Sequence, residues 1–418
     1  MQLSINELLE SLPPTTQRQL AATWAALSPD EREALLSILR GVPSERQLLR
    51  LLVGMAAAHV KTAFGRKQRV AIVGPTNVGK STLYNQFIQE PQAAAAVSPL
   101  PGTTRLPQEA EAGLFIVVDT PGADAAGAYG ALECQRGLDA ARAADFLIIV
   151  FDAGQGIRRN ELEVFTGLVG LGKPYVVVLN KSDLVKRDLA AVTQEAAASL
   201  GLKPEQVIPI SAKDGTNLLP ILMAIAISEP ELVAALGSAM PAYRRELARR
   251  STITAASLAA VIALAPLPIV DFVPLVTTQA IMVVGISRIY GRPISLSMAK
   301  ELAATFGLGF AGRTLFQELS KLGGVPGWLL SAAIASSTTI VMGHAAALWF
   351  EHGERIKPEA LKQMTERFTA TIISSLWGLG QRPNGVLLKA RVEQALEALP
   401  FTAGDEADNA ARAADASR

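Results

Sequence analysis

The sequence predicts an α/β domain with a mostly parallel sheet, flanked by a helical arm before it and an apolar, all-α domain after it. Short apolar runs rich in β-branched residues alternate with helical stretches between residues 67 and 230; these runs include RVAIVG, LFIVVDT, FLIIVFDA, PYVVVLNK and VIPISA. Apolar strands that alternate with helices are typical of a parallel sheet covered by helices on both faces. No such alternation is found before residue 67 or after residue 230.

The segments on either side are expected to be helical. The arm, residues 1–66, contains the stretch SPDEREALLSILRG, in which Ser28 has the position of an N-cap and Pro29 that of the first helical residue. Residues 231–355 are expected to form an apolar helical domain. Residues 356–418 return to amphipathic helices and end in a charged, solvated tail.

Composition excludes some classes of function. The chain has 39 Lys and Arg against 38 Asp and Glu, so no overall charge attracts nucleic acid. A single cysteine, Cys134, excludes an internal disulfide framework and favours a reducing compartment. The opening stretch MQLSINELLESLPP lacks a basic segment followed by an apolar one, so no signal peptide is expected.

The stretch GPTNVGKST, residues 74–82, has the spacing of a phosphate-binding loop between a strand and a helix. Its glycines let backbone N–H groups converge on phosphate oxygens at the helix N-terminus. Lys80 is expected to reach the β and γ phosphates, and the Ser81 hydroxyl to ligate Mg²⁺. The candidate nucleotide-binding residues here are Gly74, Asn77, Val78, Gly79, Lys80, Ser81 and Thr82.

Two further stretches predict a magnesium site and residues that take part in hydrolysis. DTPG ends the strand LFIVV, so Asp119 can hold Mg²⁺ through water and the Gly122 N–H can meet the γ phosphate. PGTTR follows the first helix of the domain, and Thr104, or else Thr103, can close onto Mg²⁺ when the γ phosphate is present. The expected catalytic set is Lys80, Thr104, Asp119 and Gly122.

The stretch NKSD, residues 180–183, selects the base. Asp183 can accept from both the ring N1–H and the exocyclic amine of guanine, whereas adenine offers neither donor at these positions. The Lys181 stem can cover the purine face, and Asn180 belongs to the same motif. The stretch SAK then supplies backbone N–H groups for the guanine oxygen; its residues are Ser211, Ala212 and Lys213. Together these motifs predict a GTP site.

Residues 69 to about 228 resemble the small bacterial GTPases of the Era and TrmE branch, above all in PGTTR and DTPG. The resemblance implies a Ras-like G domain with the P-loop NTPase fold, a mostly parallel six-stranded sheet, and a cycle between GTP and GDP. Ala123 replaces the glutamine that orients the attacking water in Ras-type enzymes. In TrmE-like relatives an asparagine matching Asn77 helps to hold K⁺. The resemblance therefore implies potassium-stimulated hydrolysis and nucleotide-dependent pairing of G domains.

Two apolar stretches mark the C-terminal domain. Residues 251–287 carry one charge, Asp271, and residues 322–350 carry none. Both could enter a bilayer, whose core needs about 20 apolar residues for each helical span; they could equally form the inner helices of a soluble bundle. Residues 250–355 also resemble the YcjF-like domain of unknown function, which implies membrane association. We expect a cytoplasmic protein docked on the inner face of the cell membrane or inserted in it.

Three functions remain open at this stage. The first is a GTP-driven switch whose effector is its own membrane-associating helical domain. The second is an Era-like GTPase of RNA or ribosome assembly, although residues 251–350 contain only a few basic residues, too sparse for a phosphate-tracking surface. The third is a membrane-remodelling GTPase, which would need a longer helical stalk.

Overall fold

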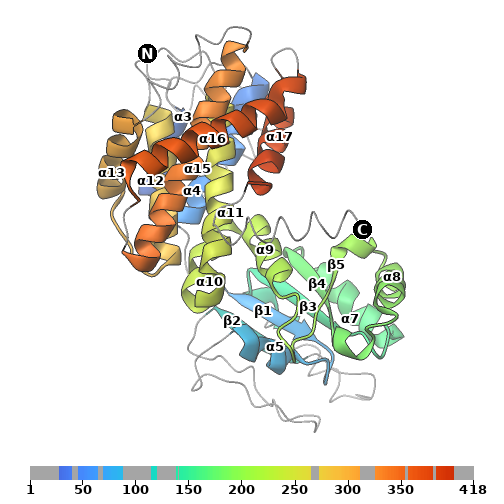
Figure 1. The fold of residues 1–418 in the computed structure, drawn as a ribbon. Helices are drawn as coiled ribbons and strands as arrows, with labels where there is room; N and C mark the ends of the chain where they lie inside the picture. Colours follow the sequence, from blue (N-terminus) through green and yellow to red (C-terminus); the bar gives the residue numbers. More distant parts are fainter. Residues whose placement is uncertain are drawn as a thin grey trace. The chain divides into compact units, whose positions relative to one another are not determined.

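The computed structural model describes residues 28–39, 46–64, 69–87, 114–119, 138–139, 141–264, 273–310, 325–353, 356–379 and 383–399. These residues form two compact units. The described residues from 69 to Arg244 form an α/β unit, and those up to Phe64 and from Arg245 onward form a helical unit (Figure 1). The N-terminal helices thus share one unit with the C-terminal helices, which the sequence places in separate segments.

The α/β unit is built on a parallel five-stranded sheet in the order β2-β1-β3-β4-β5. The strands are β1 (Val70–Gly74), β2 (Phe115–Asp119), β3 (Phe146–Asp152), β4 (Tyr175–Asn180) and β5 (Val207–Pro209). Nearly every residue in β1 to β4 is buried, as expected for strands covered on both faces. The expected count of six strands differs from the five among the described residues; the stretch expected to supply the antiparallel strand, RLPQEAEAG, lies outside them.

Helices cover the sheet on its two faces. They are α5 (Lys80–Phe87), α7 (Arg159–Val169), α8 (Leu189–Ser199) and α9 (Leu219–Ser228); α10 (Val233–Ala239) follows and packs against α9. Phe165 and Leu168 of α7 and Ala196 of α8 join the core on one face. Phe87 of α5 stacks on Phe115 of β2 on the other, with ring centroids 5.0 Å apart. All strands point the same way, so their carboxyl ends meet at one edge, where ligands bind in such sheets.

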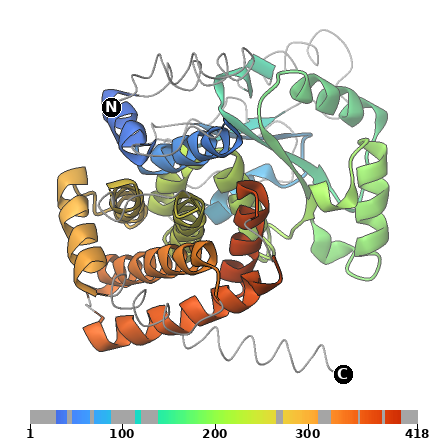
Figure 2. The ribbon, with the colours of Figure 1, turned by 90° about the horizontal axis from the view of Figure 1, so that it is seen from above.

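The helical unit contains eight α-helices among the described residues. They are α3 (Pro29–Leu39), α4 (Arg46–Phe64), α11 (Arg244–Ile262), α12 (Val273–Ile289), α13 (Leu296–Phe310), α15 (Gly327–His352), α16 (Pro358–Leu376) and α17 (Gly385–Glu397). Figure 2 shows α11 and α12 nearly end-on in the middle of the unit. From Ser251 to Ile262 every residue of α11 except Thr254 is buried. Burial inside the bundle fits inner helices that are apolar on all sides.

Local signals set several helix ends. The Ser28 hydroxyl accepts the Glu31 N–H at 3.4 Å while the Glu31 carboxylate accepts the Ser28 N–H at 2.5 Å, so the predicted N-terminus of α3 is confirmed as a capping box. The Asn384 side chain caps α17 by accepting the Leu387 N–H at 2.8 Å. Helix α15 ends at Gly353, whose φ of +75° suits glycine at this position.

Two close contacts tie the helical unit together. His59 of α4 is 1 % exposed, and its Nε2 lies 2.8 Å from the Thr278 carbonyl of α12, to which it donates. Gly343 of α15 lies against Thr252 of α11, and a Cβ at Gly343 would overlap the Thr252 side chain. The first contact connects an N-terminal helix, α4, to α12 of the C-terminal bundle.

Among the described residues one helix, α15, with 26 residues, is long and apolar enough to cross a membrane. Within the bundle 83 % of its apolar stretch is buried by other parts of the chain. Helices α9 and α10 pass the same test only as a pair, which bends by 119° at the break between them. A buried α15 has little surface left for lipid, so length and composition alone do not make it a span.

Candidate nucleotide-binding site

The loop after β1 has a backbone that only certain residues allow. Gly79 has a φ of +94°, and a Cβ there would overlap the side-chain amide of Asn180. A Cβ at Gly74 would overlap the Val150 carbonyl of the neighbouring strand. Asn77 has a φ of +65°, in the left-handed region that asparagine tolerates better than most residues. The backbone therefore requires glycine at positions 74 and 79 and favours a residue such as asparagine at position 77.

Lys80 begins α5 and is buried, with 3 % of the residue exposed. Its ammonium donates to the Pro75 carbonyl at 2.6 Å, so the side chain folds back over the loop. Ser81 and Thr82 follow in the first turn and are half-buried. A curled loop, a helix N-terminus and a lysine over the same loop fit a bound phosphate group.

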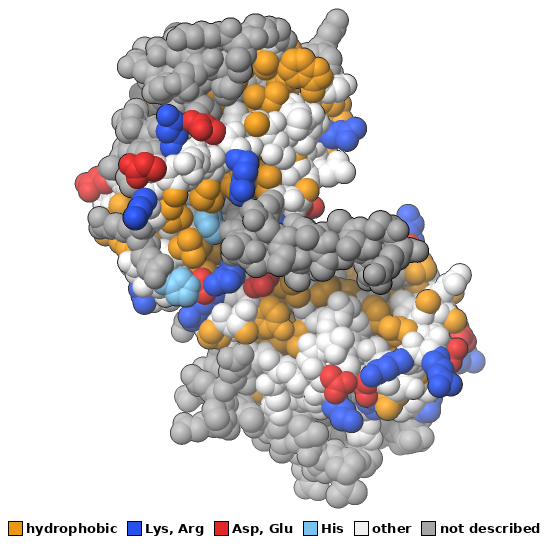
Figure 3. Space-filling view, viewed as in Figure 1, with side chains coloured by type: hydrophobic (Ala, Val, Ile, Leu, Met, Phe, Trp, Pro, Cys, Tyr) orange, Lys and Arg blue, Asp and Glu red, His pale blue; other side chains and the backbone are white. Residues whose placement is uncertain are grey.

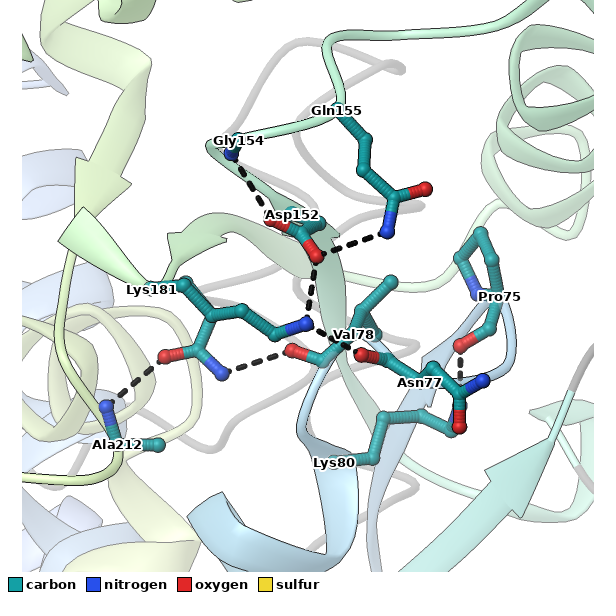
Figure 4. A network of polar contacts seen from close by, with 10 residues as sticks. Pro75, Asn77, Val78, Lys80, Asp152, Gly154, Gln155, Lys181 and Ala212 are labelled. Carbon is teal, nitrogen blue, oxygen red and sulfur yellow. Dashed lines mark hydrogen bonds and ion pairs between the residues drawn. The ribbon is translucent and has the colours of Figure 1, made fainter. Parts of the chain in front are cut away.

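Asn180, at the end of β4, connects this loop to the loop after β5. It is 2 % exposed; its Nδ2 donates to the Val78 carbonyl at 2.8 Å and its Oδ1 accepts the Ala212 N–H at 2.9 Å. Figure 4 shows both contacts. Three of the predicted motifs, GPTNVGKST, NKSD and SAK, thus meet at one side chain. In this structure the Ala212 N–H is engaged by Asn180, so its role toward the guanine oxygen stays a prediction.

Lys181 points back toward the phosphate loop. Its φ is +66°, and its ammonium donates to the Asn77 carbonyl at 2.7 Å and to the Asp152 carboxylate at 2.6 Å. Asp152, which ends β3 in the stretch FDAG, is not among the residues predicted from the sequence. One feature of the sequence could have indicated it. Asp152 is a carboxylate at the carboxyl end of a predicted strand, and the predicted motifs also lie at the carboxyl ends of strands.

Asp183 and the SAK loop face one another. The Ser211 hydroxyl donates to Asp183 Oδ1 at 2.9 Å, or alternatively to Asp214 Oδ2 at 3.2 Å. From α5, the Gln86 side chain donates to the Ala212 carbonyl at 2.8 Å and the Lys213 carbonyl at 3.4 Å. Gln86 is a second site residue that the sequence did not predict, because nothing in the neighbouring sequence distinguishes it from any polar helix residue.

The switch residues are only partly described. Asp119 is the last residue of β2 and pairs in register with Gly74, so its backbone lies beside the start of the phosphate loop. Its side-chain position and the residues Thr104 and Gly122 lie outside the described residues. Magnesium binding by Ser81, Thr104 and Asp119 therefore stays a prediction.

Comparison with known proteins agrees with this geometry. Residues 69–181 match the family described as 50S ribosome-binding GTPase. The chain contains a GTPase domain. Residues 231–373 match a second family, a domain of unknown function numbered 697. These two matches confirm a GTPase domain followed by a domain of unknown function, as the resemblances imply.

Curated relatives named GTPase Der support the same assignment. The chain is 34 % identical over 175 residues to that of Thermotoga petrophila, which is 38 % of this chain and 39 % of the relative. It is 35 % identical over 198 residues to that of Psychrobacter cryohalolentis, or 45 % of this chain and 40 % of the relative. The chain thus spans about two fifths of the length of these relatives.

Solved structures of Era match a comparable part of this chain. One is Aquifex aeolicus Era Y63A bound to GDP.AlF4⁻, with 26 % identity, a TM-score of 0.33, and coverage of 46 % of this chain and 67 % of that one. Another is Era in complex with MgGDPNP and nucleotides of 16S ribosomal RNA, with 27 % identity, a TM-score of 0.32 and the same coverage.

Proposed function

We propose that this protein is a GTP-driven molecular switch whose GTPase domain controls the state of its helical unit. The observation that carries the proposal is the assembly of Asp183, Lys181 and the phosphate loop at one edge of the sheet, held by Asn180. In this arrangement Asp183 binds the guanine edge, the Lys181 stem covers the purine, and the N-terminus of α5 holds the phosphates.

Titration calorimetry of GDP and ADP tests the base selectivity. We expect GDP to bind and ADP not to, because adenine would leave the Asp183 carboxylate without its two donors. The Asp183→Ala variant should lose GDP affinity. Asp188→Ala is the matched control, since Asp188 is an exposed aspartate a few residues further along the chain whose side chain makes no cap hydrogen bond. Equal affinity of the wild-type protein for ADP and GDP would refute the proposal.

Ions complete the proposed site. The residues expected to hold Mg²⁺ are Ser81, Thr104 and Asp119; the ion would neutralise phosphate charge. Potassium would bind near Asn77 and supply a further positive charge beside the phosphates. Nucleotide-dependent pairing of two GTPase domains belongs to the same proposal and is measurable by light scattering with GDP and with a non-hydrolysable GTP analogue.

The helical unit is proposed to dock on the surface of a membrane, at the inner face of the cell membrane. The corner where α16 ends and α17 begins exposes three large apolar side chains, Trp377 at 54 %, Val386 at 64 % and Leu387 at 44 %. Figure 3 shows hydrophobic side chains gathered at this end of the unit. Tryptophan favours the boundary between lipid and water. Burial of α15 supports docking on the surface rather than insertion.

Sedimentation with lipid vesicles tests the docking. We expect the protein to sediment with vesicles and to remain removable by alkaline carbonate, and we expect Trp377→Ser to weaken the binding. Leu162→Ser is the matched control, because Leu162 is an exposed apolar residue of α7 in the α/β unit. Protein that stays soluble in the presence of vesicles would contradict membrane docking while leaving the GTPase switch intact.

A ribosome-assembly GTPase is the second candidate, favoured by the description of the family that matches residues 69–181. This role predicts that the protein sediments with ribosomes in a nucleotide-dependent manner and is released from them by nuclease. The few basic residues in 251–350 count against a large RNA surface in the helical unit. Ribosome binding without vesicle binding would favour this second role over the first.

A further inference from the structure

Asp152 is a buried carboxylate beside the nucleotide site whose contacts the roles assigned above do not explain. It ends β3, is 5 % exposed and pairs in register with Asn180 of β4. Its Oδ1 accepts the Gly154 N–H at 2.8 Å. Its Oδ2 accepts from the Lys181 ammonium at 2.6 Å and from the Gln155 amide at 3.1 Å. Every acceptor atom of this carboxylate is thus engaged by the site around it.

The Lys181 side chain lies between two fixed acceptors. Its ammonium binds the Asp152 carboxylate on one side and the Asn77 carbonyl on the other, at 2.6 and 2.7 Å. Figure 4 shows the ammonium between these two groups. The Lys181 backbone is left-handed, at a φ of +66°, which costs free energy and needs support from surrounding contacts. A free lysine side chain would sample many rotamers, and binding its end at two points removes that freedom.

We propose that Asp152 is a positioning residue for guanine-nucleotide binding. It holds the Lys181 ammonium on the Asn77 carbonyl, so the lysine stem lies in place for the purine before the nucleotide arrives. The same contact ties the end of β4 to the phosphate loop. This inference rests on the proposed GTP site and assigns Asp152 no contact with the nucleotide, because it acts through Lys181.

The Asp152→Asn substitution separates this role from a role confined to the turn after β3. The amide keeps an oxygen that can accept the Gly154 N–H, so the turn after β3 retains its hydrogen bond. The amide nitrogen then faces the Lys181 ammonium, and two donors meet where an acceptor stood. Asp145→Asn is the matched control, because Asp145 directly precedes the same strand and accepts the Arg69 N–H at 2.9 Å at its opposite end.

Calorimetric affinities for GDP test the proposal on the full chain. We expect Asp152→Asn to raise the Kd for GDP about tenfold or more, since it removes a hydrogen bond between charged groups. We expect Asp145→Asn to leave the Kd unchanged. Circular dichroism of both variants reports whether they fold. Should Asp152→Asn fail to fold, Asp152→Ser replaces it, because the serine oxygen can serve the turn but cannot reach Lys181.

The dependence on Lys181 is tested by a double-mutant cycle. Lys181→Met keeps an apolar stem and removes the ammonium, so we expect Asp152→Asn to have no further effect on the Kd in that background. A purely structural role of Asp152 would weaken binding equally in both backgrounds. Unchanged GDP affinity in Asp152→Asn, or an undiminished effect beside Lys181→Met, overturns the inference alone. A wild-type protein that binds no guanine nucleotide overturns the proposed function as well.

Discussion

The side-chain amide of Asn180 donates to the Val78 carbonyl at 2.8 Å, although 102 residues separate the two along the chain. Val78 lies inside the phosphate loop and Asn180 at the end of β4. With its amide oxygen Asn180 also accepts from Ala212. One buried side chain therefore sets the distance between the part of the site that binds phosphate and the parts that bind the base.

Asn180→Asp should weaken nucleotide binding while preserving side-chain volume. An ionised carboxylate at this buried position would place one hydrogen-bond acceptor opposite another, the Val78 carbonyl. Leaving these groups without a donor costs about 1–3 kcal/mol of free energy or more. We expect a rise of at least about tenfold in the Kd for GDP, measured by calorimetry. Asn160→Asp makes the same chemical change on the exposed surface of α7 and should bind GDP like the wild type. Unaltered binding by Asn180→Asp would show that other contacts hold these loops together.

The loops of the site were predictable because their motifs demand particular residue types at fixed spacing. The backbone at Gly79 and Asn77 and the carboxylate of Asp183 are examples, since each is required by a local conformation or by the base. Asp152 was not predictable in the same way. Its contact with Lys181 depends on the register between β3 and β4, which no single stretch of sequence reveals.

The fold likewise has one part that the sequence predicts and one part that it does not. Alternating apolar strands and helices predict the parallel sheet, because burial on both faces imposes the pattern on each strand. The grouping of α4 with the C-terminal helices is a long-range property. It rests on contacts such as that of His59 with Thr278, whose partners are 219 residues apart. The helical spacing of apolar residues predicts each of these two helices, but it does not predict that they pack against each other.

Asn77 is the residue to change in testing for potassium. Asn77→Gly retains access to the left-handed backbone and the carbonyl that accepts Lys181, and removes only the side chain. We expect GTP turnover by the wild type to be faster in KCl than in NaCl at equal ionic strength, and this difference to vanish in the variant. The assay is phosphate release under both salts. Equal wild-type rates in the two salts would exclude a potassium role.

His59 should make the helical unit sensitive to acid. Burial lowers the pKa of His59 from 6.5 to about 4, because the charged imidazolium would be desolvated. The unfolded chain therefore binds more protons than the folded one between these values. The histidine's share of stability is complete above pH 6.5, falls as the pH drops through this window, and levels off below 4. The expected total loss is about 3 kcal/mol.

Tryptophan emission can follow this loss, because all four tryptophans lie outside residues 65–244 and so report on the helical unit. Urea unfolding between pH 7 and pH 4 should show a steeper loss for the wild type than for His59→Gln, which cannot titrate. Parallel curves for the two proteins would mean that His59 is already charged in the folded state or reaches water.

Gly343→Ala should destabilise the helical unit and spare the nucleotide site. The new Cβ would overlap the Thr252 side chain, which is 1 % exposed and donates to the Ala248 carbonyl of its own helix at 2.8 Å. Overpacking of this kind costs about 1–3 kcal/mol, because α11 and α15 must move apart. We expect a lower midpoint of urea unfolding in tryptophan emission, with an unchanged Kd for GDP.

Gly327→Ala is the matched control for this change. Gly327 begins α15, and a Cβ there would have no neighbour within 4 Å, so the same substitution should be neutral or slightly stabilising. Adding Thr252→Ala to Gly343→Ala removes the atoms that the new methyl meets first and should recover part of the stability. A Gly343→Ala protein as stable as the control would mean that α11 and α15 have room to separate. In that case the small residues of these helices would not determine how closely they pack.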